Sequence, residues 1–210
     1  MRGSEPAKAR ILPVRSRSPL SVSHPNAHRV RIIGGRYRGR VIRFPPAEGL
    51  RPTPDRVRET LFNWLGQDLA ELSTLDLYAG SGALTLEALS RGAALAVAID
   101  RDAALVRAIA ETARTFGAAG LEAHAADARA WLARETRRFD VIFLDPPFAE
   151  DPWPWLLPAC EARLAPGGLM CAESPSELAP PAPLEVFRHA KAGLVHYHLL
   201  RSVVPAKAGT

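Results

Sequence analysis

The chain has 210 residues, of which 47% are hydrophobic, and a formal net charge of +5 at pH 7. This length predicts one domain with an appendage. No apolar run approaches the roughly 20 residues of a membrane-spanning helix, so we expect no membrane contact, and we expect no secretory signal. The two cysteines, Cys160 and Cys171, match neither a metal-binding spacing nor a disulfide framework, so we expect buried thiols, a reducing cytoplasm and no metal site.

The charge is unevenly distributed along the chain. Residues 1–60 carry 14 Lys and Arg against 4 Asp and Glu, whereas residues 61–210 carry 13 against 18. A basic first third on a mildly acidic body predicts that a polyanion is held by the first part while other chemistry occurs in the second. The alternative is a solvated basic tail. Residues 1–27, rich in Pro, Ser, Ala and Arg, are expected to be such a disordered tail, unless they form a transit peptide.

A basic β-hairpin with its following loop is predicted over residues 28–52. Apolar and basic residues alternate from Arg29 to Ile32, Gly34-Gly35 is a turn signal, and a second basic strand follows. Forked guanidinium groups suit phosphates, and Arg or Tyr can stack on unpaired bases. We therefore expect nucleic-acid contact here, the alternative being an arginine-rich hairpin that protects a sheet edge. The residues expected to make this contact are Arg29, Arg31, Arg36, Tyr37, Arg38, Arg40, Arg51 and Arg56, with Arg58 extending the basic surface.

The main domain is expected over residues 53–202, with a tail at 203–210. Its first helix is predicted to have Thr53 as the N-cap and Pro54 at the first helical position. Near the C-terminus, the alternating stretches Leu184–Ala190 and Leu194–Arg201 predict two strands that finish the sheet in antiparallel fashion.

A glycine turn follows the first strand of this domain. The strand carries Asp76 and runs into Gly80-Ser81-Gly82, which opens a helix. Strand, Gly-x-Gly and helix form a nucleotide-type loop, because glycines let a ligand approach the backbone and the helix N–H groups face it. An acid at Asp76 suits a cationic ligand end, such as an amino group, better than a pyrophosphate.

The next two strands also end in an acid. Asp100 can accept hydrogen bonds from both ribose hydroxyls, unless it is an ordinary surface residue. Asp127 can accept a hydrogen bond from an adenine amine, can cap the helix that starts at Ala128, or can do both.

The fourth strand ends in the most informative motif. The apolar run Val141–Leu144 indicates a buried strand, and Asp145-Pro146-Pro147-Phe148 then ends it, because prolines cannot continue the ladder. In a parallel sheet, the carboxyl ends of the strands form one crevice. The ordered acids and the glycine turn predict an adenosine-like ligand with a cationic end; S-adenosylmethionine fits this description, and NAD fits it less well.

The chain resembles class I methyltransferases with an Asp-Pro-Pro-Phe signature, and more narrowly the RsmD family, which methylates the exocyclic N2 of a guanine in small-subunit (16S) ribosomal RNA. The resemblance covers about residues 29–201, and the run from Arg-Pro-Thr to Asn-Trp is its specific part. The matching stretches are Arg31–Gly35, Gly49–Thr53, Asp55–Trp64, Ala79–Leu84 and Asp145–Phe148.

The resemblance implies a Rossmann-like α/β fold with a mostly parallel seven-stranded sheet, an antiparallel last strand and an N-terminal β-hairpin. It implies S-adenosylmethionine as the cofactor, with its methionine end held near Asp76 and the glycine turn, its ribose near Asp100 and its adenine near Asp127. The cofactor-binding residues implied are Asp76, Ala79, Gly80, Ser81, Gly82, Asp100, Arg101, Asp127 and Ala128. The target base would be held by Asp145, Pro146, Pro147 and Phe148.

Three other functions remain open at this point. An adenine-N6 methyltransferase acting on DNA or RNA uses the same acid-Pro-Pro-aromatic motif. An NAD(P)-dependent dehydrogenase would use the glycine turn and Asp100 but leaves Asp145–Phe148 without a role. A non-catalytic RNA-binding assembly factor could keep the same fold. For the enzyme, we expect a cytoplasmic monomer acting on ribosomal RNA, within an assembling small subunit.

Overall fold

The computed structural model describes residues 28–47, 49–50, 52–147 and 151–203. The expected tail at residues 1–27 lies outside these ranges, as do all but the first residue of the expected tail at 203–210 and the predicted site residues Arg51 and Phe148. None of the helices in the described part of the chain is long and apolar enough to cross a membrane.

The main sheet has seven strands in the order β5-β4-β3-β6-β7-β9-β8. Strands β3 to β7 run parallel, whereas β9 lies antiparallel to both β7 and β8. The predicted mostly parallel sheet with an antiparallel last strand is therefore confirmed. The strands are β3 (Ser73–Asp76), β4 (Leu95–Asp100), β5 (Leu121–Ala125), β6 (Phe139–Leu144), β7 (Leu164–Ser174), β8 (Leu184–Ala192) and β9 (Val195–Ser202).

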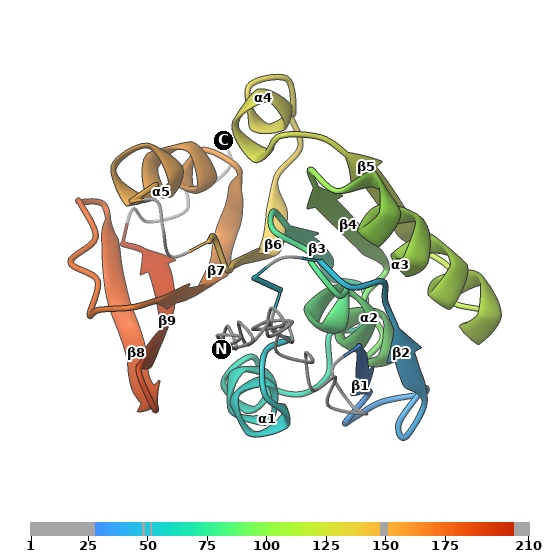
Figure 1. Ribbon diagram of the computed structural model, residues 1–210. Coiled ribbons are helices and arrows are strands. Elements are labelled where there is room, and N and C mark those ends of the chain that lie inside the picture. The colour runs from blue at the N-terminus through green and yellow to red at the C-terminus, as the bar shows by residue number, and fades with distance from the viewer. Residues whose placement is uncertain (1–27, 48, 51, 148–150, 204–210) are drawn as a thin grey trace, which may run out of the picture.

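Helices cover both faces of this sheet (Figure 1). One face packs against α4 and α5, and the other against α1, α2 and α3. Because the central strands are buried on both faces, they read as continuous apolar runs; Ala96 to Ile99 in β4 are all fully buried. The helices are α1 (Asp55–Trp64), α2 (Ala83–Ser90), α3 (Ala103–Phe116), α4 (Ala128–Leu132) and α5 (Trp153–Glu161). Cys160 and Cys171 are free and buried, as predicted.

The N-terminal hairpin consists of β1 (Arg29–Arg31) and β2 (Val41–Arg43), with Arg29 opposite Arg43. The predicted hairpin is confirmed, and Gly34-Gly35 lies in the segment that joins its strands, but the second strand begins only at Val41. The strands are joined by residues 32–40, a segment that hydrogen-bonds within itself, as from the Ile32 N–H to the Arg40 carbonyl at 2.9 Å, and also to the end of α2. The Arg36 N–H donates to the Ser90 carbonyl at 2.6 Å and the Tyr37 N–H to the Ser90 hydroxyl at 2.8 Å.

The start of α1 also differs from the prediction. The helix begins at Asp55, Pro54 occupies the N-cap, and no side chain caps it. Thr53 is buried, and its side chain hydrogen-bonds to Glu173 at the end of β7. The expected capping hydroxyl is therefore used at the carboxyl edge of the sheet.

Candidate functional site at the carboxyl edge of the sheet

Three carboxylic acids lie at the carboxyl ends of neighbouring central strands. Asp76 is paired in register with Phe143, and Asp145 and Glu173 directly follow the paired residues Leu144 and Ala172. Register partners in a parallel sheet point to the same face, and residues two apart along a strand do so as well. All three acids therefore point to the face that α1 and α2 cover.

Burial makes these acids hard to ionise. It raises the pKa of Asp76 to about 7, helped by the nearby charges of Asp145 and Asp100 and opposed by a 2.7 Å hydrogen bond from the Thr85 hydroxyl. Burial also raises the pKa of Asp145 to about 7. The cluster thus combines proton-holding groups with a strand end where ligands bind in this class of sheet.

Glu173 is a site residue that the sequence reasoning missed. It is 6% exposed, and within the described residues its Oε1 atom is buried without a hydrogen-bond partner. Burial and then the charge of Asp145 raise its pKa well above the usual range of a glutamic acid. The signal was available, because Glu173 follows an apolar run, as do the acids at or near the ends of the preceding four strands. An unsatisfied buried oxygen of this kind points to a proton or a ligand as its partner.

Hydrogen bonds attach the glycine turn to Asp100 at the end of β4. Asp100 accepts the Gly80 N–H through Oδ2 and the Asp102 N–H through Oδ1, both at 2.8 Å. Gly82 has φ of +75°, and a Cβ atom there would lie 2.6 Å from Cγ1 of Ile109 in α3. The turn therefore requires glycine at this position both for its backbone angle and for its close contact with α3.

The remaining predicted cofactor residues fall into exposed and buried groups. Asp127 is exposed and caps α4, with its Oδ1 accepting the Ala130 N–H at 2.9 Å, so the capping role is confirmed and Oδ2 remains open to another partner. Arg101 is exposed, whereas Ala79, Ser81 and Ala128 are buried. On the target side, Pro146 is buried and Pro147 is exposed beside the partly exposed Asp145.

The basic N-terminal residues are divided between the surface and the interior. The side chains of Arg29, Arg31, Arg36, Arg38 and Arg56 are exposed, and Arg31 lies 3.7 Å from Asp55. Arg40 is also exposed, but its guanidinium lies 4.1 Å from the Phe116 ring centroid and donates to the carbonyls of Thr115 and Phe116. Arg40 therefore also attaches the hairpin to α3.

Two residues expected on the basic surface are buried, so those predictions are wrong. Tyr37 is only 6% exposed, packs against the Phe116 ring and donates its hydroxyl to the Gly117 carbonyl, so it cannot stack on a base. Arg58 is fully buried, and it is an internal ion-pair partner of Asp55 and Glu87. A single sequence shows an arginine but does not show whether an acid lies opposite it in the fold.

The fold defines the class of the protein. A parallel sheet carries its ligand site at the carboxyl edge, and the antiparallel β9 inserted between β7 and β8 separates it from the all-parallel dinucleotide-binding sheet. This is a Rossmann-like class I methyltransferase fold with an added N-terminal hairpin.

Comparison with known proteins gives the family. Residues 30–201 match the model of the family described as Conserved hypothetical protein 95. The chain is 35% identical to Ribosomal RNA small subunit methyltransferase D of Haemophilus influenzae, over 86% of this chain and 98% of that relative. It is 44% identical to the protein of the same name from Escherichia coli (strain K12), over 60% of this chain and 64% of that relative's length. The chain belongs to this family, and the resemblance to the RsmD family is confirmed.

Solved structures agree with this assignment. The chain is similar to a putative methyltransferase, yhhF, from Escherichia coli, with a TM-score of 0.75 and 40% identity over 83% of this chain and 98% of that chain. A putative methylase from Haemophilus influenzae gives a TM-score of 0.67 and 30% identity over 83% and 98%.

Proposed function

We propose that this protein transfers a methyl group from S-adenosylmethionine to the exocyclic N2 amine of a guanine in small-subunit ribosomal RNA. The observation that carries the proposal is the cluster of Asp76, Asp145 and Glu173 beside the glycine turn that Asp100 binds. The names of the relatives, which are ribosomal RNA small subunit methyltransferases, support the substrate class. Action in the cytoplasm, as a monomer and on an assembling subunit, stays a prediction.

The residues around the glycine turn fit this cofactor. Each carboxylate oxygen of Asp100 accepts one backbone N–H and keeps a lone pair for a ribose hydroxyl. Asp76 supplies an acid for the cationic methionine end, and the free oxygen of Asp127 can accept the adenine amine. Arg101, Ala79, Ser81 and Ala128 border these positions. When bound, the cofactor supplies an electrophilic methyl group on its sulfonium.

The target amine needs help from the protein, because its lone pair is delocalised into the guanine ring. Hydrogen bonds from its N–H groups to Asp145 and to a backbone carbonyl at Pro146 would hold the nitrogen in line with the methyl group, which supplies much of the rate through orientation. Phe148 is proposed to stack on the base. The nitrogen loses one proton as it gains the methyl group, and ionised Asp145 is placed to accept that proton.

The base must leave its stack to reach this buried edge, as base-modifying enzymes require. The exposed arginines of the hairpin, together with Arg56, are proposed to hold the surrounding phosphates. Arg51 completes the proposed set but lies outside the described residues. Adenine-N6 methylation stays the competing function, because an acid-Pro-Pro turn alone does not select the base.

Calorimetry tests the cofactor. We expect S-adenosylmethionine to bind one-to-one in the micromolar range and NAD to give no heat. Binding of NAD in place of S-adenosylmethionine would overturn the proposal.

Mass spectrometry of ribosomal RNA nucleosides, from cells with and without the protein, tests the product. N2-methylguanosine should disappear from small-subunit RNA when the protein is absent. Loss of N6-methyladenosine would support the competing enzyme, and an unchanged nucleoside profile would support a non-catalytic assembly factor.

A further inference from the structure

A cluster of three histidines lies outside the carboxyl-edge site. His189 on β8 and His198 on β9 are direct cross-strand partners, and His196 lies two residues before His198 on the same face of β9. In the other direction, His198 pairs with Ala172 and His196 with Ser174, so the imidazoles point away from the face that carries Glu173. The cluster therefore belongs to the α5 side of the sheet.

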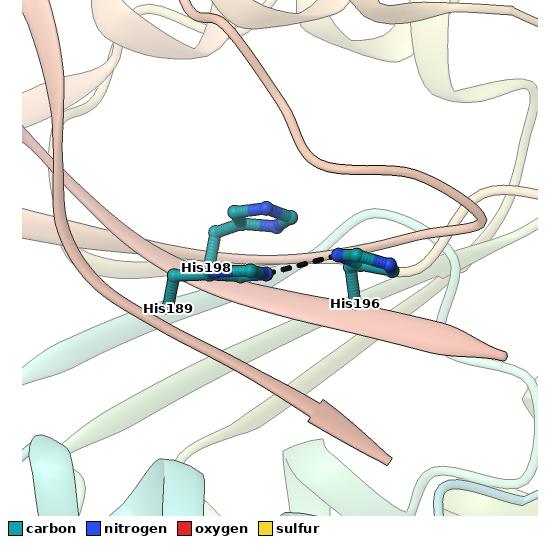
Figure 2. A group of neighbouring side chains, drawn as sticks. All are labelled: His189, His196 and His198. Atoms are coloured by element: carbon teal, nitrogen blue, oxygen red, sulfur yellow. Dashed lines mark hydrogen bonds between the residues drawn. The ribbon is translucent and has the colours of Figure 1, made fainter. Parts of the chain in front are cut away.

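The three side chains are already close together. One ring nitrogen from each lies within 4.8 Å of the others. Figure 2 shows the rings of His189 and His196 side by side, with the Nε2 and Nδ1 atoms 3.0 Å apart and joined by a hydrogen bond, and the His198 ring stacked over His189. Two ring nitrogens that face each other at this distance must share one proton, which is the position that a metal ion can take.

His198 is held in the manner of many metal-binding histidines. Its Nδ1 lies 3.4 Å from the Ala172 carbonyl, while its Nε2 accepts the Leu178 N–H at 3.1 Å. A ligating histidine commonly donates its other ring N–H to a backbone carbonyl, which fixes the tautomer and leaves the second nitrogen for the metal.

A carboxylate lies beside the imidazoles. Oε1 of Glu177, in the loop that follows β7, is 3.9 Å from Nδ1 of His189. We propose that His189, His196 and His198 bind a late first-row divalent cation such as Zn²⁺, with Glu177 as the fourth ligand. Three imidazoles with one oxygen ligand form a donor set that suits Zn²⁺, Cu²⁺ or Ni²⁺ and discriminates against Mg²⁺ and Ca²⁺.

Binding requires a rearrangement within the cluster. The His189 and His196 planes are 14° apart and those of His196 and His198 15°, whereas a metal ion lies in the plane of each imidazole that it binds. Tetrahedral Zn²⁺, with bonds of about 2.0–2.1 Å, holds its ligand atoms about 3.3 Å apart. The His189 and His196 nitrogens, 3.0 Å apart, would therefore separate slightly, while the nitrogens that lie up to 4.8 Å apart would approach. His189 is exposed on an edge strand and His196 is partly exposed, so both rings can turn towards a buried His198. The ion would displace the Leu178 N–H from His198.

The site would be structural. It would join the edge strand β8, strand β9 and the loop carrying Glu177 on the face opposite the acid cluster, and it does not depend on the proposed methyl transfer. A closed four-ligand site ties segments together and leaves no open position for chemistry.

Calorimetry of tag-free, chelator-treated full-length protein with ZnCl₂ tests the proposal, and the Co²⁺-loaded protein reports tetrahedral geometry through its visible spectrum. We expect one ion per chain and a higher melting temperature with Zn²⁺. His189→Ala and His196→Ala should each weaken binding by more than the roughly 10–100-fold that loss of an outer hydrogen-bond partner costs. His198→Gln should do the same while keeping an acceptor for Leu178.

His124→Ala is the matched control, because His124 is an exposed strand histidine outside the cluster. It should leave Zn²⁺ binding unchanged. Absence of one-to-one binding to the wild-type protein would overturn the proposal. Undiminished binding in the His189→Ala and His196→Ala variants would also overturn it. Because these two residues are exposed or partly exposed, we expect both variants to fold.

Discussion

A carboxylic acid buried beside other acids holds its proton longer than one in water, because each ionisation adds negative charge to a region of low dielectric. In this protein, burial raises the pKa of Asp76 and Asp145 to about 7 and that of Glu173 well above its usual range. At neutral pH the cluster therefore retains a proton, which is shared among groups that titrate together. A site that methylates an amine needs an ionised acceptor for the proton that the nitrogen releases.

Replacing Asp145 with Asn tests the acceptor role. Asparagine has a similar shape but cannot take a proton, so we expect methyl transfer to fall by roughly 10²–10⁴-fold. Calorimetric affinity for S-adenosylmethionine should be nearly unchanged, since the glycine turn and Asp100 are untouched. Asp151→Asn, at an exposed position, is the control and should keep full activity. Parallel loss of cofactor binding and methyl transfer would show that Asp145 acts elsewhere.

Glu173→Gln tests the third acid. A group whose pKa is raised in the folded state supports stability below its unfolded pKa, and this contribution is lost as pH rises through the folded value. Glutamine mimics the neutral acid and cannot ionise. We therefore expect the variant to methylate RNA at neutral pH and to gain melting temperature over the wild type as pH rises from about 5 to about 9.

Glu185→Gln, in an exposed pair with Arg201, is the matched control for this pH dependence. It should show the same melting temperature difference from the wild type at every pH. If the melting temperature difference between Glu173→Gln and the wild type were also independent of pH, Glu173 would already be ionised in the native protein.

Among the secondary-structure elements, α2 attaches the N-terminal segment to the body. Glu87 is fully buried and accepts the backbone N–H groups of Ile33 at 2.9 Å and Gly34 at 2.7 Å. The same carboxylate pairs with buried Arg58 at 3.2 Å and with Arg91 at 2.9 Å. One side chain thus joins the hairpin loop, α1 and α2, and its removal would leave the buried guanidinium of Arg58 without the fully buried carboxylate that it pairs with.

We expect Glu87→Gln to lower the free energy of unfolding by about 3–5 kcal/mol, the usual result of breaking a buried ion pair from one side. Urea denaturation followed by circular dichroism measures this loss. Glu111→Gln removes a carboxylate from the exposed pair with Arg114 and should leave the unfolding midpoint nearly unchanged. Equal midpoints for the two variants would contradict the structural role of Glu87.

The secondary-structure elements could be predicted where a local sequence pattern determines them. Alternation, buried apolar runs and the glycine turn predicted the sheet, its antiparallel finish and the strand-end acids. The length of the loop after β1 was not predicted, because Ser90, a residue 53 positions away, binds the Tyr37 N–H. Long-range contacts of this kind leave no local pattern. The same holds for the histidine cluster, because its members are brought together only by the pairing of β8 with β9.

On the scale of the whole molecule, the exposed arginines of the hairpin lie at one end of the sheet (Figure 1). The hairpin packs beside α2 and α3, whereas β8 is the opposite edge of the sheet (Figure 1). Residues 1–60 hold 14 of the 27 Lys and Arg, yet burial of Arg58 and docking of Arg40 reduce the number free to hold phosphates. Arg36 and Arg38 are exposed and are therefore better probes of RNA contact than Arg40, whose loss would also loosen the hairpin.

Measuring RNA affinity against salt concentration tests this surface. For single-stranded RNA, each phosphate contact contributes roughly 0.7 to the slope of log affinity against log salt, because counterions are released on binding. Arg36→Ala with Arg38→Ala should weaken binding and reduce the slope by about 1.4 if both side chains contact phosphates. Arg188→Ala, an exposed arginine on β8, should change neither quantity. If the double variant kept the wild-type affinity and slope, the hairpin would have no part in RNA binding; if Arg188→Ala lowered both equally, overall charge and not the hairpin would hold the RNA.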